Sequence, residues 1–324
     1  MKIFKDKKIW ESSEKVFLSY LYTSIRARPF QLYDEIGKIL FARPEIEHSN
    51  IYFIVENTKI RFIPEKTTVD KNGVIKIFFR IANKRSMRRK VTFPQLFLDK
   101  ATLEKGFKSV IIGVKDQENF EKEMFRRKTS FLSGLSFNLT KSNDNILIFN
   151  VYTKDWTREL PMIAHNLIDL LKISIADKSR ILYIGQSNQI KKRIAVHEKI
   201  QRALSEVADD KDIYIYFFTF VAKHFYMNAP KRFAEFIENP ETGYIHDQGL
   251  LNLVEMGLIN YFKPRYNSTF VDTEISSNQQ VEKLLRDNGF TQMVIDVDFD
   301  DKIWHFSSDC IPSKESHSII YKIE

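Results

Sequence analysis

Glycine is scarce in this chain, at 10 of 324 residues. This share of about 3% is less than half of the usual ~7%, so few positions allow the left-handed or closely approached backbone that glycine permits. The sequence holds no glycine-rich loop of the kind that cradles nucleotide phosphates. Each glycine is therefore expected to serve a specific local geometry.

Length and composition predict a folded protein of about two domains. The 38.3 kDa chain is 43% hydrophobic and 13% aromatic, which is enough apolar material for substantial cores. A single cysteine, Cys310, excludes a disulfide framework and a zinc site built on paired cysteines. No apolar run approaches the ~18 residues that span a bilayer, and the basic first residues lack the apolar block of a signal peptide. We therefore expect a cytoplasmic protein without membrane association.

The charge balance favours a polyanionic partner. Lys and Arg number 50 against 42 Asp and Glu, which gives a net charge of +8 and an isoelectric point near 9.2. Six cations fall between positions 80 and 90 without an acid among them, and they are the predicted DNA-binding residues: Arg80, Lys84, Arg85, Arg88, Arg89 and Lys90. The alternative for this cluster is the solvated rim of a β-hairpin.

The first 140 residues have the pattern of a mixed α/β segment. Apolar spacing predicts a helix over 13–42, interrupted at Pro29. Runs rich in Ile, Val and Phe predict strands over 51–63, 74–81 and 110–114. The polar stretch 140–145 has the composition of a linker. We therefore predict an N-terminal α/β domain over 1–140, with a DNA-binding or specificity role.

The rest of the chain alternates strands with helices. The predicted strands are 146–152, 181–184, 214–220 and 293–299, and the predicted helices are 159–173, one that begins near Ser187, 249–262 and 279–287. This pattern places a second domain over 141–272. A short C-terminal extension over 273–324 follows it.

A carboxylate interrupts the apolar face of the predicted helix 249–262. Leu251, Glu255, Leu258 and Phe262 follow i, i+4, i+7 and i+11 spacing and so share one face. Because a buried, unpaired carboxylate costs several kcal/mol, Glu255 is expected to face a cleft, a cation or a hydrogen-bond partner. The alternative is an ion pair with a nearby Lys or Arg at the edge of the stripe.

Arg193 and His197 lie one turn apart in the helix predicted after Gly185, beside its apolar stripe. A guanidinium binds phosphate through its bidentate fork, and an imidazole donates or accepts a proton near neutral pH. The spacing is therefore compatible with two side chains that meet the same phosphate.

The order of these residues resembles the GIY-YIG nuclease signature over about residues 146–270. Its second half, a Tyr-Ile-Gly strand followed by a helix with Arg and His, is matched by Tyr183-Ile184-Gly185-Gln186-Ser187, Arg193 and His197. The family's metal-binding helix and its closing Pro-x-x-Asn are matched by Glu255, Pro264 and Asn267. The resemblance implies an α+β fold, in which a small GIY-YIG-like sheet of three strands is flanked by helices and carries the N-terminal domain and the C-terminal extension as additions.

The first half of the signature, Gly-Ile-Tyr, normally lies on a strand about ten residues before the second tyrosine. We assign it to Asn150-Val151-Tyr152, with residues 153–180 as an insert between the paired strands. Such an insert is tolerable because doubling the length of a loop costs only ~0.6 kcal/mol. Tyr152 is thus the predicted first tyrosine of the site, and Asn150 replaces the glycine.

The resemblance implies a role for each residue. Glu255 would hold one Mg²⁺ or Mn²⁺, mostly through waters and substrate oxygens, and Arg193 would clamp the scissile phosphate. Tyr152 and Tyr183 would flank the attacking water, with one phenol as general base, and His197 would orient a group or accept a proton; the division of these roles stays open. The structural roles would fall to Asn267 at the end of the metal-binding helix, Ser187 as the cap of the helix of Arg193, and Gly185.

The sequence therefore predicts a divalent-metal-dependent endonuclease that hydrolyses phosphodiester bonds of double-stranded DNA, in restriction or anti-phage defence. A homodimer is compatible with double-strand cleavage, because one active site cuts one strand at a time. The alternative is a non-cleaving nucleic-acid-binding protein that retains the nuclease fold.

Overall fold

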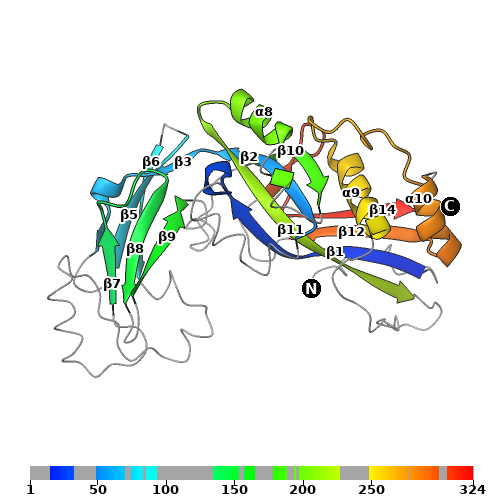
Figure 1. Ribbon diagram of the computed structural model, residues 1–324, viewed down its shortest axis with the longest axis horizontal. Helices are drawn as coiled ribbons and strands as arrows, with labels where there is room; N and C mark the ends of the chain where they lie inside the picture. The colour runs from blue at the N-terminus through cyan, green and yellow to red at the C-terminus, as the bar shows by residue number, and fades with distance from the viewer. Residues whose placement is uncertain are drawn as a thin grey trace, which may run out of the picture. The chain divides into compact units, whose positions relative to one another are not determined.

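The chain divides into two compact units, one of which is inserted into the other (Figure 1). The first unit combines Met1–Asn57 with Asp177–Glu324, and the second is Thr58–Ala176. This division differs from the predicted boundaries at 140 and 272. The computed structural model describes residues 15–32, 49–69, 74–82, 85–92, 134–152, 157–164, 178–187, 193–194, 197–226, 248–276, 278–298 and 305–323.

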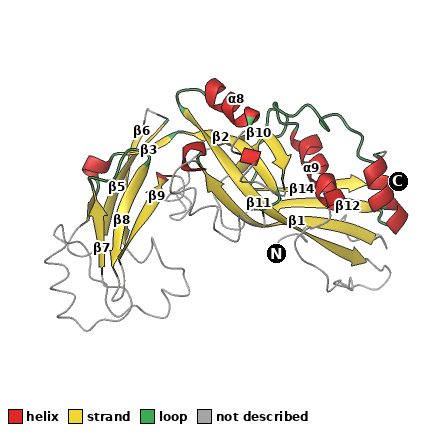
Figure 2. Cartoon of the chain, in the orientation of Figure 1, coloured by secondary structure: helices red, strands yellow, loops and turns green. Residues whose placement is uncertain are grey.

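A seven-stranded mixed sheet organises the first unit (Figure 2). In sheet order its strands are β13 (His305–Ser307), β10 (Lys178–Gln186), β2 (Ile51–Thr58), β11 (Lys211–Tyr226), β1 (Lys15–Ala27), β12 (Gln292–Asp298) and β14 (Ser316–Lys322). β1 pairs antiparallel with β11 and parallel with β12, while β10 pairs antiparallel with β2 and parallel with β13.

The two edges of this sheet approach each other. The Phe306 carbonyl of β13 accepts hydrogen bonds from the Lys314 backbone N–H at 3.2 Å and from the His317 Nε2–H of β14 at 3.0 Å. The sheet is therefore nearly closed, which leaves little unpaired edge.

Helix α9 (Gln248–Phe262) packs against β10, β12 and β14. A Cβ on Gly257 would come within 2.4 Å of the Ile295 side chain of β12, so this glycine permits the close approach of helix and sheet. The Tyr321 hydroxyl of β14 donates to the Gly257 carbonyl at 2.8 Å. The other helical segments of the unit are α8 (Glu198–Glu206), α10 (Gln279–Leu284), η2 (Pro29–Leu32) and η4 (Arg286–Asn288).

The second unit contains two smaller sheets. Its first sheet has the order β3-β5-β4 with β6 paired to β5, and consists of β3 (Ile60–Phe62), β4 (Thr68–Val69), β5 (Val74–Ile81) and β6 (Arg85–Thr92). The short η3 (Pro64–Lys66) lies between β3 and β4. Its second sheet is the antiparallel set β7 (Gly134–Asn138), β8 (Ile146–Tyr152) and β9 (Thr157–Ile163).

Several predicted elements are confirmed, and two helices are not. The strands near 51, 74, 146, 181, 214 and 293 and the helices near 249 and 279 are present. The helix predicted over 13–42 is instead the strand β1 followed by η2, and the first part of the helix predicted over 159–173 is strand β9. The first part of β1 is buried on both faces, because residues 16–19 are all buried, and an apolar run of this kind has no period that distinguishes a strand from a buried helix. The strand predicted at 110–114 lies outside the described residues.

The α+β class is confirmed, because antiparallel and mixed sheets are combined with a few helices. The main sheet has seven strands and is larger than the three-stranded sheet that the sequence predicted. None of the helices in the described part of the chain has the length and apolar character needed to cross a membrane.

Candidate active site

Two tyrosines on neighbouring antiparallel strands form the centre of the site. Tyr52 on β2 lies opposite Gly185 on β10, and Tyr183 lies opposite Ile54. Residues that are directly opposed in an antiparallel pair share one face of the sheet, so both phenols belong to the same face, with ring centroids 6.0 Å apart. Tyr52 is fully buried and Tyr183 is partly buried.

Gly185 leaves the space that the two phenols occupy. A Cβ at this position would lie 2.6 Å from Cε1 of Tyr183 and 2.7 Å from the hydroxyl of Tyr52. Real side chains do not approach so closely, and aromatic rings packed on a sheet have little freedom to give way. Gly185 is therefore required by the packing of the two tyrosines.

Asn50 holds the start of β2 in place. Its side-chain amide donates to the Phe220 carbonyl of β11 at 3.3 Å, and its side-chain oxygen accepts from the Phe220 N–H at 3.1 Å. The Asn50 carbonyl accepts from the backbone N–H of Ser187, immediately after β10, at 3.1 Å. One residue thus ties β2 to both neighbouring strands, immediately before Tyr52.

His197 is fixed as a hydrogen-bond donor to Tyr52. It precedes α8 as the N-cap, and its Nδ1 accepts from the Lys199 backbone N–H at 3.1 Å. Burial, with a smaller contribution from the charges of Arg193 and Lys199, lowers the pKa of His197 to about 4, so the ring is neutral at physiological pH. A neutral ring that accepts at Nδ1 carries its proton at Nε2, and Nε2 lies 2.6 Å from the Tyr52 oxygen.

Arg193 contacts both phenols. Its guanidinium hydrogen-bonds the hydroxyls of Tyr52 and Tyr183, and these bonds raise the pKa of Arg193 above its ordinary value. Burial raises the pKa of Tyr52 far above its ordinary value, which outweighs the opposing effect of Arg193. Tyr52 is therefore a neutral phenol whose oxygen accepts from both His197 and Arg193. The side chain of Arg193 is otherwise exposed to solvent.

Glu255 of α9 brings a carboxylate to the same region. Its carboxyl hydrogen-bonds the backbone and the side chain of Gln186, the last residue of β10, and it feels the charge of Arg193. Burial outweighs these contacts and raises the pKa of Glu255 to about 7. The carboxylate is thus held next to the strand of Tyr183 at a desolvation cost.

Two amide side chains of α9 hydrogen-bond Gln186, the residue that contacts this carboxylate. Gln248 and Asn252, one turn apart on α9, hydrogen-bond each other at 2.9 Å, and Gln248 also donates to the Gln186 side chain at 2.9 Å. Gln186 in turn donates to Asn252. This neutral network orients the side chain of Gln186 that contacts Glu255.

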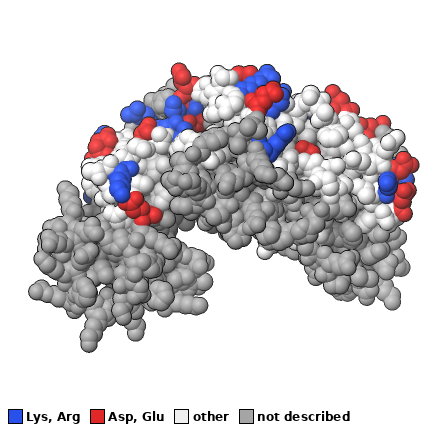
Figure 3. All heavy atoms as spheres, in the orientation of Figure 1, with Lys and Arg blue, Asp and Glu red and all other residues white. Residues whose placement is uncertain are grey.

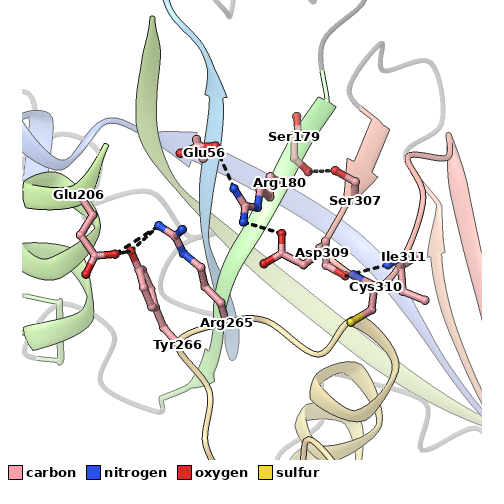
Figure 4. Close-up of polar contacts among 11 residues, drawn as sticks. Glu56, Ser179, Arg180, Glu206, Arg265, Tyr266, Ser307, Asp309, Cys310 and Ile311 are labelled. Atoms are coloured by element: carbon pink, nitrogen blue, oxygen red, sulfur yellow. Dashed lines mark hydrogen bonds and ion pairs between the residues drawn. The ribbon is translucent and has the colours of Figure 1, made fainter. Parts of the chain in front are cut away.

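The turn after α9 is attached to the central strand of the site. Asn267 donates to the Ile184 carbonyl at 2.8 Å and accepts from the Ile184 N–H at 3.0 Å, so it hydrogen-bonds both sides of one residue of β10. Figure 4 shows the neighbouring Tyr266, whose hydroxyl donates to Glu206 of α8 at 2.6 Å, with Arg265 beside it. These contacts tie α8, α9 and β10 around the tyrosines.

The C-terminal end of β2 and the N-terminal end of β10, which flank the inserted second unit, are linked by an ion pair between side chains. Arg180 of β10 lies opposite Glu56 of β2. Its guanidinium lies 3.8 Å from the Glu56 carboxylate and 2.5 Å from the carboxylate of Asp309 (Figure 4). Arg180 thus links β2, β10 and the segment after β13 at the end of the β2 and β10 pair where the second unit is inserted.

The chemistry of these donors fits a hard divalent cation with one protein ligand. Among the described residues there is no group of three or more His, Cys, Asp or Glu side chains that would enclose a metal ion. Glu255 is a partly buried carboxylate that hydrogen-bonds Gln186, and the charge of Arg193 offsets part of the rise in its pKa that burial causes. Mg²⁺ is often held by one or two carboxylates together with waters and phosphate oxygens, which this arrangement permits.

The structure brings together most of the residues that the sequence singled out. Tyr183, Gly185, Arg193, His197, Glu255 and Asn267 lie around one end of the β2 and β10 pair. His197 differs from expectation, because it caps α8 and does not share a helix with Arg193. Ser187 directly follows β10, and the residues that it was expected to cap, 188–192, lie outside the described ranges.

Tyr152, the predicted first tyrosine, does not lie on a strand that pairs with the strand of Tyr183. Tyr152 is the last residue of β8 in the second unit, where its backbone pairs with Gly134 and Thr157. The tyrosine that pairs with the strand of Tyr183 is Tyr52, in the segment Asn50-Ile51-Tyr52. This segment agrees with Gly-Ile-Tyr at two of three letters, whereas Asn150-Val151-Tyr152 agrees at one. The better match to Gly-Ile-Tyr was thus present in the sequence, but it lies far from Tyr183 along the chain.

The predicted DNA-binding residues belong to the second unit. Arg80 is exposed on β5, and Arg85, Arg88, Arg89 and Lys90 lie on β6. Lys84 lies outside the described residues.

Comparison of the chain with models of protein families, with curated proteins and with solved structures found no match.

Proposed function

We propose that this protein is a divalent-metal-dependent endonuclease that hydrolyses phosphodiester bonds in DNA, with an active site of the GIY-YIG kind. The observation that supports it is the convergence of two strand-borne tyrosines, an arginine, a histidine and a single carboxylate around the end of the β2 and β10 pair. In this proposal Asn50-Ile51-Tyr52 takes the place of Gly-Ile-Tyr, and Tyr52 replaces Tyr152 as the first tyrosine.

Each residue has a chemical task that its environment favours. Arg193 has an exposed guanidinium at the site and would clamp the scissile phosphate. Glu255 would hold Mg²⁺ or Mn²⁺, which when bound neutralises charge on the phosphate and assists the departing 3′ oxygen. Both groups would then meet the substrate on the face of the sheet that carries the phenols.

Tyr52 is suited to orient the attacking water through Tyr183. Its oxygen accepts hydrogen bonds from His197 and Arg193, and its phenol also hydrogen-bonds the Tyr183 side chain, so its own hydrogen is directed to Tyr183, which is partly exposed and would contact the water. A phenol with a pKa raised by burial keeps this proton at neutral pH. His197 is then a positioning residue that holds Tyr52.

The proposal is tested by incubating the purified protein with plasmid and long linear DNA in Mg²⁺ or Mn²⁺, beside a Glu255→Gln variant. The variant keeps the side-chain volume and loses the anionic ligand. Discrete fragments that depend on Glu255 are expected of a site-specific enzyme, and a smear that depends on Glu255 is expected of a non-specific one. Intact DNA together with a gel shift would instead indicate the non-cleaving binding protein, and cleavage that persists in the variant would exclude this active site.

The expectations of a role in restriction or anti-phage defence and of a homodimer remain predictions. A test with phage infection of cells that carry the wild-type or the Glu255→Gln gene addresses the first. Sedimentation of the protein with and without duplex DNA addresses the second.

A further inference from the structure

The positive charge of the chain resides in the inserted unit. Thr58–Ala176 holds 23 Lys and Arg residues against 12 Asp and Glu residues, a formal net charge of +11. The remainder of the chain holds 27 against 30, a net charge of −3, and the two values account for the +8 of the whole. The unit with the candidate active site therefore has a slight negative charge and lacks the electrostatic attraction for a polyanion that the insert has.

The visible surface of the first unit agrees with this partition. In Figure 3, the Lys and Arg atoms of its described residues are interspersed with Asp and Glu atoms on the face shown. Many of the described cations of this unit are also paired with acids, as Arg180 is with Glu56 and Asp309. We therefore expect a cluster of charge of one sign in the second unit, which has the excess of Lys and Arg.

Burial along strand β5 distinguishes the two faces of the first sheet in the second unit. Ile77 and Phe79 are buried, at 0% and 1% exposure, whereas Lys76 and Phe78 are partly exposed and Arg80 is exposed. Side chains alternate between the faces of a strand. One face of this sheet, which we call the inner face, is therefore packed in the core, and the other, the outer face, is open to solvent.

The register of the neighbouring strands extends the outer face. On β6, Lys90 lies opposite Lys76 and Arg88 lies opposite Phe78, so both occupy outer-face positions. The outer face also includes Ser86 opposite Arg80 and the exposed Thr68 of β4 opposite Lys76.

The inner-face positions of β6 include two of the six cations that the sequence grouped together. Arg89 lies opposite Ile77, and Arg85 lies opposite Ile81. The register thus divides the basic cluster into two sets, which the linear sequence could not do. Arg61 of β3 is opposite Arg80 and adds another outer-face position, but its guanidinium is paired with Asp144 at 3.7 Å.

We propose that the outer face formed by β5 and β6, with Lys76 and Arg80 on β5 and the outer-face register positions of Arg88 and Lys90 on β6, binds the phosphate backbone of double-stranded DNA, the substrate of the proposed nuclease. This inference rests on the proposed function for its choice of DNA as the polyanion. Four cations without an acid among these strand positions provide non-specific phosphate contacts, which position a duplex and carry no sequence information. The catalytic unit and the DNA-holding surface are then on different parts of the chain.

The experiment compares two sets of variants in the full chain with Glu255→Gln, so that the DNA stays intact. The outer-face set is Arg80→Gln, Arg88→Gln and Lys90→Gln, and the matched inner-face set is Arg85→Gln and Arg89→Gln. Binding of a 5′-fluorescein 30-base-pair duplex is followed by anisotropy in EDTA from about 50 to 200 mM NaCl, a range over which phosphate contacts lose most of their strength. Circular dichroism and thermal unfolding establish that each variant is folded.

The outer-face set is expected to weaken binding roughly tenfold or more and to reduce the salt slope by about one for each cation removed. The inner-face set should leave the salt slope of binding close to that of the parent protein. Because the two sets differ in size, the change in slope is divided by the number of cations removed. Equal effects per cation in the two sets would overturn the assignment to one face, and so would the absence of duplex binding by the parent protein at low salt.

Failure of this inference is distinguishable from failure of the proposed function. If the wild-type chain cleaves DNA and the outer-face substitutions, made without Glu255→Gln, leave both binding and cleavage unchanged, the active site stands and the outer face is not the DNA-holding surface. If the chain never cleaves but the outer-face set loses binding selectively, the surface stands and the nuclease does not.

Discussion

Nε2 of His197 lies 2.6 Å from the hydroxyl oxygen of Tyr52, across 145 positions of sequence. Because Nδ1 of the same ring accepts from Lys199, the proton between His197 and Tyr52 belongs to the histidine. His197 is therefore the donor and Tyr52 the acceptor of this hydrogen bond, and in this state His197 cannot take a proton from Tyr52. A histidine at this place acts through the tyrosine that it holds.

The first prediction separates positioning by His197 from proton transfer. His197→Gln retains an N–H donor and should keep most of the DNA cleavage rate, whereas His197→Leu removes the donor and should reduce kcat about a hundredfold by misplacing Tyr52. The measurement is single-turnover cleavage from pH 6 to 9. If His197 were a general base, Gln and Leu would be equally inactive, and the acidic limb of the pH profile would change in both.

The second prediction concerns the effect of the buried Glu255 carboxylate on the free energy of unfolding. A carboxyl whose pKa is about 7 in the folded state and about 4.5 in the unfolded state binds more protons when folded, so its stabilising effect is complete below the unfolded pKa and is lost as the pH rises through 7. At pH 8 without metal, Glu255→Gln should raise the free energy of unfolding by roughly 1 to 3 kcal/mol while it abolishes cleavage. Urea unfolding at pH 8 and at pH 4.5 checks this, since the difference should nearly disappear at the lower pH.

The third prediction concerns Gly185. Gly185→Ala places a methyl group within 2.6 to 2.8 Å of both phenols, so we expect a loss of roughly a hundredfold in activity and a destabilisation of about 1 to 3 kcal/mol. Gly289→Ala is the matched control, because Gly289 has a φ of 75° and no neighbour within 4 Å of its added Cβ. Backbone strain should lower the free energy of unfolding of that variant by about 1 to 2 kcal/mol. The folded variant should cleave DNA as fast as the wild type. Equal activity losses in both would contradict the packing role.

The fourth prediction concerns the closure of the sheet by His317. This ring is 2% exposed, donates to the Phe306 carbonyl, and lies 3.1 Å from the Tyr261 hydroxyl. Burial lowers its pKa to about 4, so the unfolded chain takes up the proton first as the pH falls. His317 should then weaken folding progressively between about pH 6.5 and 4.

The test compares wild type with His317→Gln. At pH 7 the variant should be less stable by about 1 to 3 kcal/mol through the lost hydrogen bonds and packing, and the gap should narrow as the pH approaches 4.5. The other titrating groups, Glu255 and His197 included, are common to both proteins and cancel in the difference. A gap that is constant over this range would show that His317 does not titrate as its burial implies.

Local patterns were sufficient for a large part of the site. The apolar stripe around Glu255 predicted both helix α9 and the unusual carboxylate in it, and the Tyr183-Ile184-Gly185 strand was located correctly. These features depend on spacing within one turn or one strand, which the sequence records directly. The strand β1 was missed because its residues 16–19 are all buried, which removes the alternation by which strands are identified.

The sequence by itself thus determined the strand of Tyr183, the helix of Glu255 and most of the side chains that the structure brings together around them. Only the tertiary structure decided that Tyr52 is the partner of Tyr183, and that Arg88 and Arg89 lie on opposite faces of one strand. Strand pairing depends on burial and register between distant segments, and a long insertion adds little to the entropy cost of closing the pair. Proximity along the chain therefore pointed to Tyr152, and packing in three dimensions brought Tyr52 to the site.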